Sequence, residues 1–227
     1  MGPRLSLYLV LILATPCFGA NEDFTTFTET DPDSKLTVTS SRVTSTLANS
    51  RTETYSVYKD YGAGHFGNFS HLLTVFASAM NNAGSSPVLG YALISNQTGD
   101  IAGAEANGDG LSVHMFTGNY NLTMEEQDAF NSDFYDADTL IVYYLTIGRA
   151  STTATVLIYS DSGRTTLLDT LSIAMSSTTF RYISTAAGYD SGGAATVSGY
   201  AEDLNLQEAT PNPSVIQGAV MQGSVLR

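Results

Sequence analysis

The chain has 227 residues with 22 acidic and 9 basic side chains, a formal net charge of −13 at pH 7, and 43% hydrophobic residues. This length and apolar content allow one sizeable all-β domain or two small ones. Nucleic acid and anionic membrane surfaces are disfavoured as partners, because binding to phosphate relies on clustered Lys and Arg. Only 14% of the residues are charged, against an average of about 25%, and Ser and Thr supply the remaining polarity, as is typical of extracellular β proteins.

The N-terminus carries a targeting signal. A short basic start ending at Arg4 precedes an apolar stretch, residues 5–13, which is too short to span a bilayer. The small residues Cys17 and Gly19 then form a cleavage region. We expect a signal peptide at residues 1–19, and therefore a secreted, extracellular or surface-associated protein, including one carried on a virion. An unprocessed hydrophobic N-terminus and a misassigned start are the alternatives.

The first half of the chain predicts short strands. The acidic, Thr-rich residues 20–33 form a lead-in segment that can add an edge strand. Strands are predicted at residues 36–39, 42–47, 54–59, 69–79, 88–95 and 111–116. In residues 69–79, His71 shares a face with apolar residues, so we expect it at the core or its rim rather than as a ligand. An acidic excursion follows at residues 120–138, with a short helix predicted at residues 124–130.

Residues 140–206 predict five consecutive strands separated by short turns. The continuous apolar run at residues 140–147 predicts a strand buried on both faces. The next run, residues 152–160, alternates between apolar and polar residues. Further strands are predicted at residues 167–175, 180–186 and 196–206. Regular spacing with turn residues between the strands, and no helical period, predicts an all-β fold, either an antiparallel sandwich or a barrel.

These elements give a simple domain organisation. We predict one sandwich domain at residues 20–208, after the leader. Residues 209–227 contain Pro211 and Pro213 and then a weak apolar pattern, which predicts a flexible C-terminal tail.

One loop, residues 59–68, concentrates three glycines, two aromatic residues, an Asp and a His. Loops of this kind carry function on a rigid scaffold. The alternative is a tight connection in which the glycines permit the backbone path and the aromatic residues cap the sandwich. The candidate ligand-binding residues are Tyr58, Asp60, Tyr61, His65, Phe66 and Asn68.

A second loop offers oxygen ligands for calcium. Glu105, Asn107 and Asp109 stand at alternate positions before Gly110, which allows a sharp turn. The pattern resembles half of a calcium-binding loop, although Phe116 stands where the closing Glu would be. Apart from this calcium hypothesis, we expect no cofactor.

Motifs for catalysis are scarce. The sequence contains no G-x-S-x-G, no phosphate-binding G-x-x-x-x-G-K-[ST], no H-E-x-x-H and no C-x-x-C. Glu126 and Asp128 are the only carboxylates that we nominate for a glycosidase pair, and Asn131 stands where the second catalytic Glu would be. We therefore expect a protein that is not an enzyme.

Three stretches resemble the concanavalin A-like lectin and glucanase superfamily of jelly rolls, in its laminin-G-like form. Residues 68–79 resemble an early core strand, residues 145–161 resemble a strand pair that turns near Arg149, and residues 199–206 resemble the closing strand. The chain is also similar to uncharacterised jelly-roll proteins of bacteria and their viruses. The resemblance covers about residues 24–208. It implies a two-sheet jelly roll and, often, glycan binding or adhesion on the concave sheet or at its loops.

These observations favour an exported, non-catalytic binding or adhesion module for glycans or another cell-surface component, without a transmembrane span. A structural protein of a virion or cell surface is the first alternative. A glycan-cleaving enzyme that uses Glu126 and Asp128 is the second.

Overall fold

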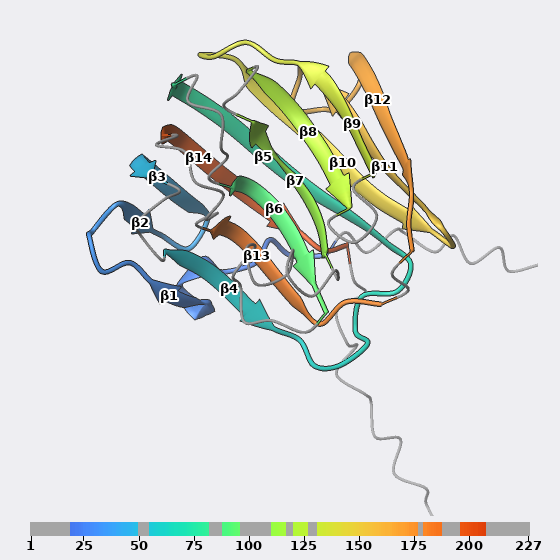
Figure 1. The fold of residues 1–227 in the computed structure, drawn as a ribbon, viewed down its shortest axis with the longest axis horizontal. Coiled ribbons are helices and arrows are strands. Elements are labelled where there is room, and N and C mark those ends of the chain that lie inside the picture. The colour runs from blue at the N-terminus through green and yellow to red at the C-terminus, as the bar shows by residue number, and fades with distance from the viewer. Residues whose placement is uncertain are drawn as a thin grey trace, which may run out of the picture.

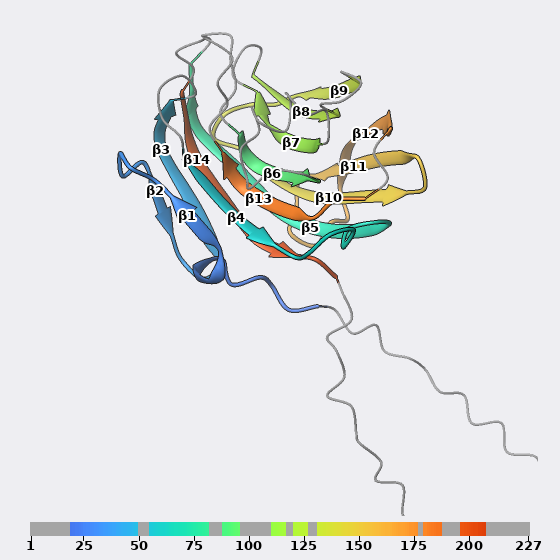
Figure 2. The ribbon, with the colours of Figure 1, turned by 60° about the horizontal axis from the view of Figure 1, so that its bottom comes forward.

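The computed structural model describes residues 19–49, 55–81, 88–95, 110–116, 120–126, 131–176, 179–187 and 196–207. These residues form two antiparallel sheets packed face to face, as Figures 1 and 2 show. Sheet I consists, in spatial order, of β1 (Thr28–Thr30), β4 (Ser56–Asp60), β13 (Tyr182–Ala187), β6 (Val88–Ile94), β7 (Gly110–Phe116), β8 (Asn121–Glu126) and β9 (Asn131–Asp136). Sheet II consists of β12 (Leu167–Ala174), β11 (Thr153–Tyr159), β10 (Val142–Ala150), β5 (Phe69–Met80), β14 (Thr196–Asn205), β3 (Arg42–Asn49) and β2 (Leu36–Val38). A short 3-10 helix, η1 (Phe24–Thr26), precedes β1. The predicted two-sheet antiparallel sandwich is confirmed.

The core lies between the sheets and follows from the alternation in the sequence. In β10, Tyr143, Leu145 and Ile147 are buried, and the residues between them are partly exposed. In the neighbouring strand β5, Leu73 and Val75 are fully buried on the same face of the sheet, where they pair with Leu145 and Tyr143. Successive side chains of a strand point to opposite faces, so each strand of sheet II gives one row to the core and one row to an outer face.

The prediction that residues 140–147 are buried on both faces is wrong. Leu140 and Ile141 precede β10 and are 69% and 43% exposed, and β10 itself alternates. Strand β6 of sheet I is instead buried on both sides, because the neighbouring residues Tyr91 and Ala92 are both fully buried. An apolar run shows that a strand is apolar on both faces, but only the packing determines whether both faces are covered.

The predicted short helix at residues 124–130 is wrong for its first part. Residues 124–126 end strand β8, which pairs with β7 on one side and with β9 on the other in an unbroken register. Two ladders of backbone hydrogen bonds outweigh the local helix propensity of a Glu-rich segment. The rest of that prediction, residues 127–130, lies outside the described residues.

Gly199 shows how closely β14 lies against β5. The register of β14 against β5 shifts between Ser198 and Gly199, and Gly199 has φ +159°. A Cβ atom at this position would lie 2.0 Å from the carbonyl oxygen of Phe76 and 2.9 Å from Cα of Ala77. Only glycine allows this approach without movement of the backbone.

The predicted leader and tail lie almost entirely outside the described residues. Gly19 is the exception, because its carbonyl oxygen accepts a hydrogen bond from Nδ2 of Asn205. Among the described residues, no helix has the length and apolar character that crossing a bilayer requires.

Candidate functional site

The connection between β4 and β5, residues 61–68, crosses from sheet I to sheet II at one end of the sandwich (Figure 1). Gly62 and Gly64 take φ values of +92° and +70°, which residues with a Cβ rarely adopt. Further along, Phe66 exchanges two backbone hydrogen bonds with Phe180, of 3.0 and 2.9 Å. The glycines therefore permit the path of the loop, and the bridge to Phe180 fixes it.

This loop and the start of β5 bring five rings together. His65 lies 4.9 Å from Tyr61 and 4.6 Å from Phe66, measured between ring centroids. His71 stacks on Phe69 at 4.6 Å and meets Phe66 edge-on at 5.5 Å. Phe66 is 2% exposed and belongs to the core, whereas His65 is exposed. Three residues of the predicted site, Tyr61, His65 and Phe66, thus form one cluster with two residues of β5.

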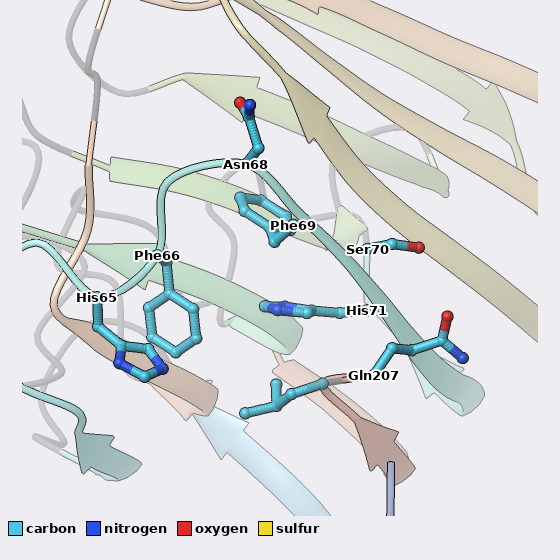
Figure 3. A pocket seen from close by; sticks show the side chains of 8 residues that line it. His65, Phe66, Asn68, Phe69, Ser70, His71 and Gln207 are labelled. Atoms are coloured by element: carbon cyan, nitrogen blue, oxygen red, sulfur yellow. The ribbon is translucent and has the colours of Figure 1, made fainter. Parts of the chain in front are cut away.

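A partly open hollow of about 380 Å³ lies against the cluster, and Figure 3 shows the side chains around it. Its walls include His65, Phe66, Phe69, Ser70, His71 and Gln207. The volume falls within the roughly 300–1,000 Å³ typical of small-molecule sites. None of the described residues that line it is Asp, Glu, Lys or Arg, so the hollow suits an uncharged ligand with both apolar and hydrogen-bonding surfaces.

His71 is the most unusual group in this wall. It is 1% exposed, and its Nδ1 lies 2.7 Å from the hydroxyl oxygen of the buried Tyr91. Burial, assisted by the nearby His65, lowers the pKa of His71 to about 3, while burial raises the pKa of Tyr91. The imidazole is therefore neutral at physiological pH. Its second nitrogen, Nε2, has no hydrogen-bond partner, although buried polar atoms normally have one.

The other predicted ligand-binding residues have partners of their own. Tyr58 stands edge-on to a tyrosine of β13, with ring centroids 6.2 Å apart. Asp60 accepts two hydrogen bonds from Arg181, of 2.8 and 2.7 Å, and this pairing is the main reason that its pKa falls to about 2. Asn68 borders the hollow, but its side-chain oxygen accepts a hydrogen bond from the backbone N–H of Ser151, and Figure 3 shows the amide turned away.

Sequence reasoning missed Phe69, Ser70 and Gln207. Phe69 and Ser70 directly follow the glycine-rich loop, so extending the candidate segment by a few residues would have found them. The burial of His71 was predicted from the apolar residues on its face, but its unpartnered nitrogen has no sequence signal. Gln207 is distant in sequence, and only the fold places it beside the loop.

Glu126, which we nominated as a catalytic carboxylate, is fully buried and serves as a hydrogen-bond acceptor. It accepts from the backbone N–H and the hydroxyl of Ser176, and the amide of Asn131 lies 3.4 Å away. Its negative charge also stabilises the charged form of the buried Arg149. These contacts hold the end of β12 against β8. Asp128 lies outside the described residues.

The calcium hypothesis stays a prediction. Glu105, Asn107 and Asp109 lie outside the described residues. Within the described ranges, no group of three or more His, Cys, Asp or Glu side chains is placed to hold a metal ion.

Comparison with solved structures identifies the class of fold. A functionally unknown protein from Saccharomyces cerevisiae is similar with a TM-score of 0.52 and 11% identity, covering 81% of this chain and 96% of that chain. Lectin II from Ulex europaeus has a TM-score of 0.48 and 10% identity, with 83% and 96% of the chains covered. The exoplasmic/lumenal domain of VIP36, in its Ca²⁺/Man3GlcNAc-bound form, has a TM-score of 0.48 and 9% identity, with 86% and 90% covered.

The chain therefore shares its two-sheet antiparallel sandwich fold with the yeast protein, and this is the fold class that its sequence pattern predicts. The likeness to the yeast protein shows the fold alone. No family model and no curated protein matches the sequence.

Proposed function

We propose that this protein is a non-catalytic module that binds an uncharged sugar in the hollow beside residues 61–71, outside the cell or on a surface. The observation that carries the proposal is the unpartnered Nε2 of His71 in the wall of an aromatic-lined hollow. A buried polar atom without a partner favours a ligand that supplies one. The N-terminal leader pattern supports the location.

The chemistry of the wall matches a sugar ring. Sugars present apolar C–H faces and hydroxyl edges, so they suit sites that combine aromatic surfaces with a few polar groups. His65 and Phe69 supply ring surfaces. The hydroxyl of Ser70, the amide of Gln207 and Nε2 of His71 supply neutral hydrogen-bonding groups. Since His71 is neutral, its second nitrogen pairs with a hydroxyl without the penalty of a buried charge.

The expected affinity is low. A hexose has about 12 non-hydrogen atoms, and at roughly 0.3 kcal/mol per atom it gains about 4 kcal/mol, which corresponds to a dissociation constant near 1 mM. The test is an NMR titration of the protein with a panel of neutral monosaccharides. We expect one or more of them to shift the resonances of His65, Ser70 and Gln207.

Matched variants locate the binding. His65→Ala and Gln207→Ala should each weaken the affinity by about 3- to 10-fold, which is the loss of one hydrogen bond or ring contact. Phe134→Ala should leave the affinity unchanged, because Phe134 is a 56% exposed aromatic residue of β9 outside the hollow. The proposal is wrong if no neutral sugar shifts these resonances at ~50 mM, well above the expected dissociation constant.

A further inference from the structure

A second hollow, of about 240 Å³, lies on the outer face of sheet II. Neighbouring parts of the same two chain segments form both hollows. In β5, Ser70 borders the first hollow and Thr74 borders the second. At the end of β14, Gln207 borders the first hollow and Asn205 borders the second. The walls of the second hollow differ from those of the first, since they include a cation, Arg164.

A bulge in β14 explains why the arginine lies there. Glu202 pairs with Thr74 of β5, but the next pair joins Asn205 to Leu72, so β14 offers no partner to Leu73 between them. Arg164, from the turn between β11 and β12, fills this place with a hydrogen bond of 3.4 Å to the carbonyl oxygen of Leu73.

The hydrogen bonds of the Arg164 guanidinium are long. Besides the bond to Leu73, it donates to the carbonyl oxygen of Leu145 at 3.3 Å and to that of Ser162 at 3.5 Å. These distances lie at the outer limit for N–H···O bonds, and carbonyl oxygens carry no full charge. The guanidinium therefore retains capacity for a stronger acceptor.

The charge of Arg164 is also poorly balanced. The side chain is half-buried, and desolvation lowers its pKa. Within the described residues Arg164 forms no salt bridge, and Asp203, which lines the same hollow, acts on it only as a neighbouring charge. The carboxylate of Asp203 accepts a hydrogen bond from Nδ2 of Asn21 at 3.0 Å. A partly desolvated cation without a paired anion favours an anionic ligand.

Two residues with unusual backbone geometry meet at this hollow. Arg164 and Asp203 have φ values of +52° and +55°, a region that non-glycine residues enter uncommonly. The N–H of Arg164 donates to the carbonyl oxygen of Asp161 at 3.0 Å, and that of Asp203 donates to Ser41 at 2.9 Å. Arg164 is thus held by its own turn and Asp203 by the segment before β3, and both side chains line the same hollow. Residues in sparsely populated backbone conformations cluster at ligand sites.

We propose that the second hollow binds an acidic sugar, a pyranose ring that carries a carboxylate, as in a uronate unit of a glycan. The proposal rests on the proposed function in that the ligand is a sugar. Arg164 pairs with the carboxylate, for which its planar guanidinium is suited. Tyr144, partly exposed on the outer face, offers a ring surface, and Thr74, which also lines the hollow, offers a hydroxyl for hydrogen bonding. The carboxylate of Asp203 would repel a simple anion but accepts hydrogen bonds from hydroxyls, which favours a sugar acid.

The test compares a uronic-acid disaccharide with its methyl ester, which has the same sugar without the charge. We expect the wild-type protein to bind the acid about 10-fold tighter, as one charge-assisted pair predicts. Arg164→Gln should abolish this preference, and Arg164→Lys should keep part of it, because lysine retains the charge but not the planar fork. In the wild type, the acid and not the ester should protect Arg164 from phenylglyoxal, followed by peptide mass spectrometry.

The protection experiment needs no variant, so it decides the matter even where Arg164→Gln fails to fold. Equal affinity for acid and ester, or equal protection by both, would overturn the inference. The inference would also be overturned if His65→Gln lost the preference for the acid over the ester while Arg164→Gln kept it. The carboxylate would then be recognised in the first hollow. If neutral sugars fail to bind while the acid protects Arg164, only the proposal for the first hollow is refuted.

Discussion

Mild acid should destabilise this protein through its buried histidines. The native pKa of His71 is about 3 and that of His114 about 4, both lowered by burial, against about 6.5 in an unfolded chain. Because each native pKa lies below the unfolded one, the unfolded state takes up the proton first. The free energy of unfolding that comes from burying the neutral imidazoles is therefore fully present above about pH 6.5. It is lost as the pH falls from about 6.5 toward the native pKa values.

The size of the loss follows from these pKa values. Between pH 7 and pH 5, a histidine that titrates near 6.5 when unfolded and stays neutral when folded lowers the free energy of unfolding by about 2 kcal/mol. His71 is 1% exposed and His114 is 3% exposed, so solvent screening reduces this figure little. Together the two histidines should remove about 4 kcal/mol, a large part of the 5–15 kcal/mol that typical domains have.

Denaturant unfolding at pH 7 and pH 5 isolates the contribution of His71. The carboxylates are the same in the wild type and in His71→Gln. Their contribution therefore cancels when the loss in free energy of unfolding between pH 7 and pH 5 in one protein is subtracted from that in the other. Glutamine keeps a polar group beside the hydroxyl of Tyr91 but does not titrate. We expect the wild type to lose about 2 kcal/mol more than His71→Gln over this interval.

An equal loss in the wild type and in His71→Gln would refute the reasoning. It would mean that the imidazole accepts a proton within the fold, and the neutral donor or acceptor proposed for sugar binding would then be absent at acidic pH. A wild type that becomes more stable between pH 7 and pH 5 would contradict the same argument for both histidines.

Two further substitutions test the packing. Gly199→Ala should destabilise the protein by at least about 3 kcal/mol, read as a lowered midpoint of thermal unfolding, because the new Cβ would lie 2.0 Å from the carbonyl oxygen of Phe76. Gly67→Ala, where a Cβ meets nothing within 4 Å, is the control, and equal effects would contradict the clash. Glu126→Ala should lower the free energy of unfolding by about 3 kcal/mol in denaturant, because it leaves the buried Arg149 without its counter-charge, whereas a change below ~1 kcal/mol would show that the charge is solvated.

Much of the fold was predictable because strand alternation is local. The faces of β5 follow from residue parity alone, and the alternation of Ala154, Val156 and Ile158 placed β11 correctly. The errors came from interactions between distant segments. Residues 124–126 join a strand because β7 and β9 pair with them, and β10 is covered on one face only because of its position in sheet II.

The candidate site likewise has features that the sequence determines and features that only the tertiary structure determines. The sequence by itself determined that one loop would gather Tyr61, His65 and Phe66, since glycines and aromatic residues in close succession dictate a tight, packed turn. Only the tertiary structure decided that His71 keeps an unpartnered nitrogen in the wall of a hollow, and that Arg164 lies where a bulge in β14 leaves a gap. Parity and turn chemistry act over a few residues, whereas desolvation and strand register depend on segments far apart in the chain.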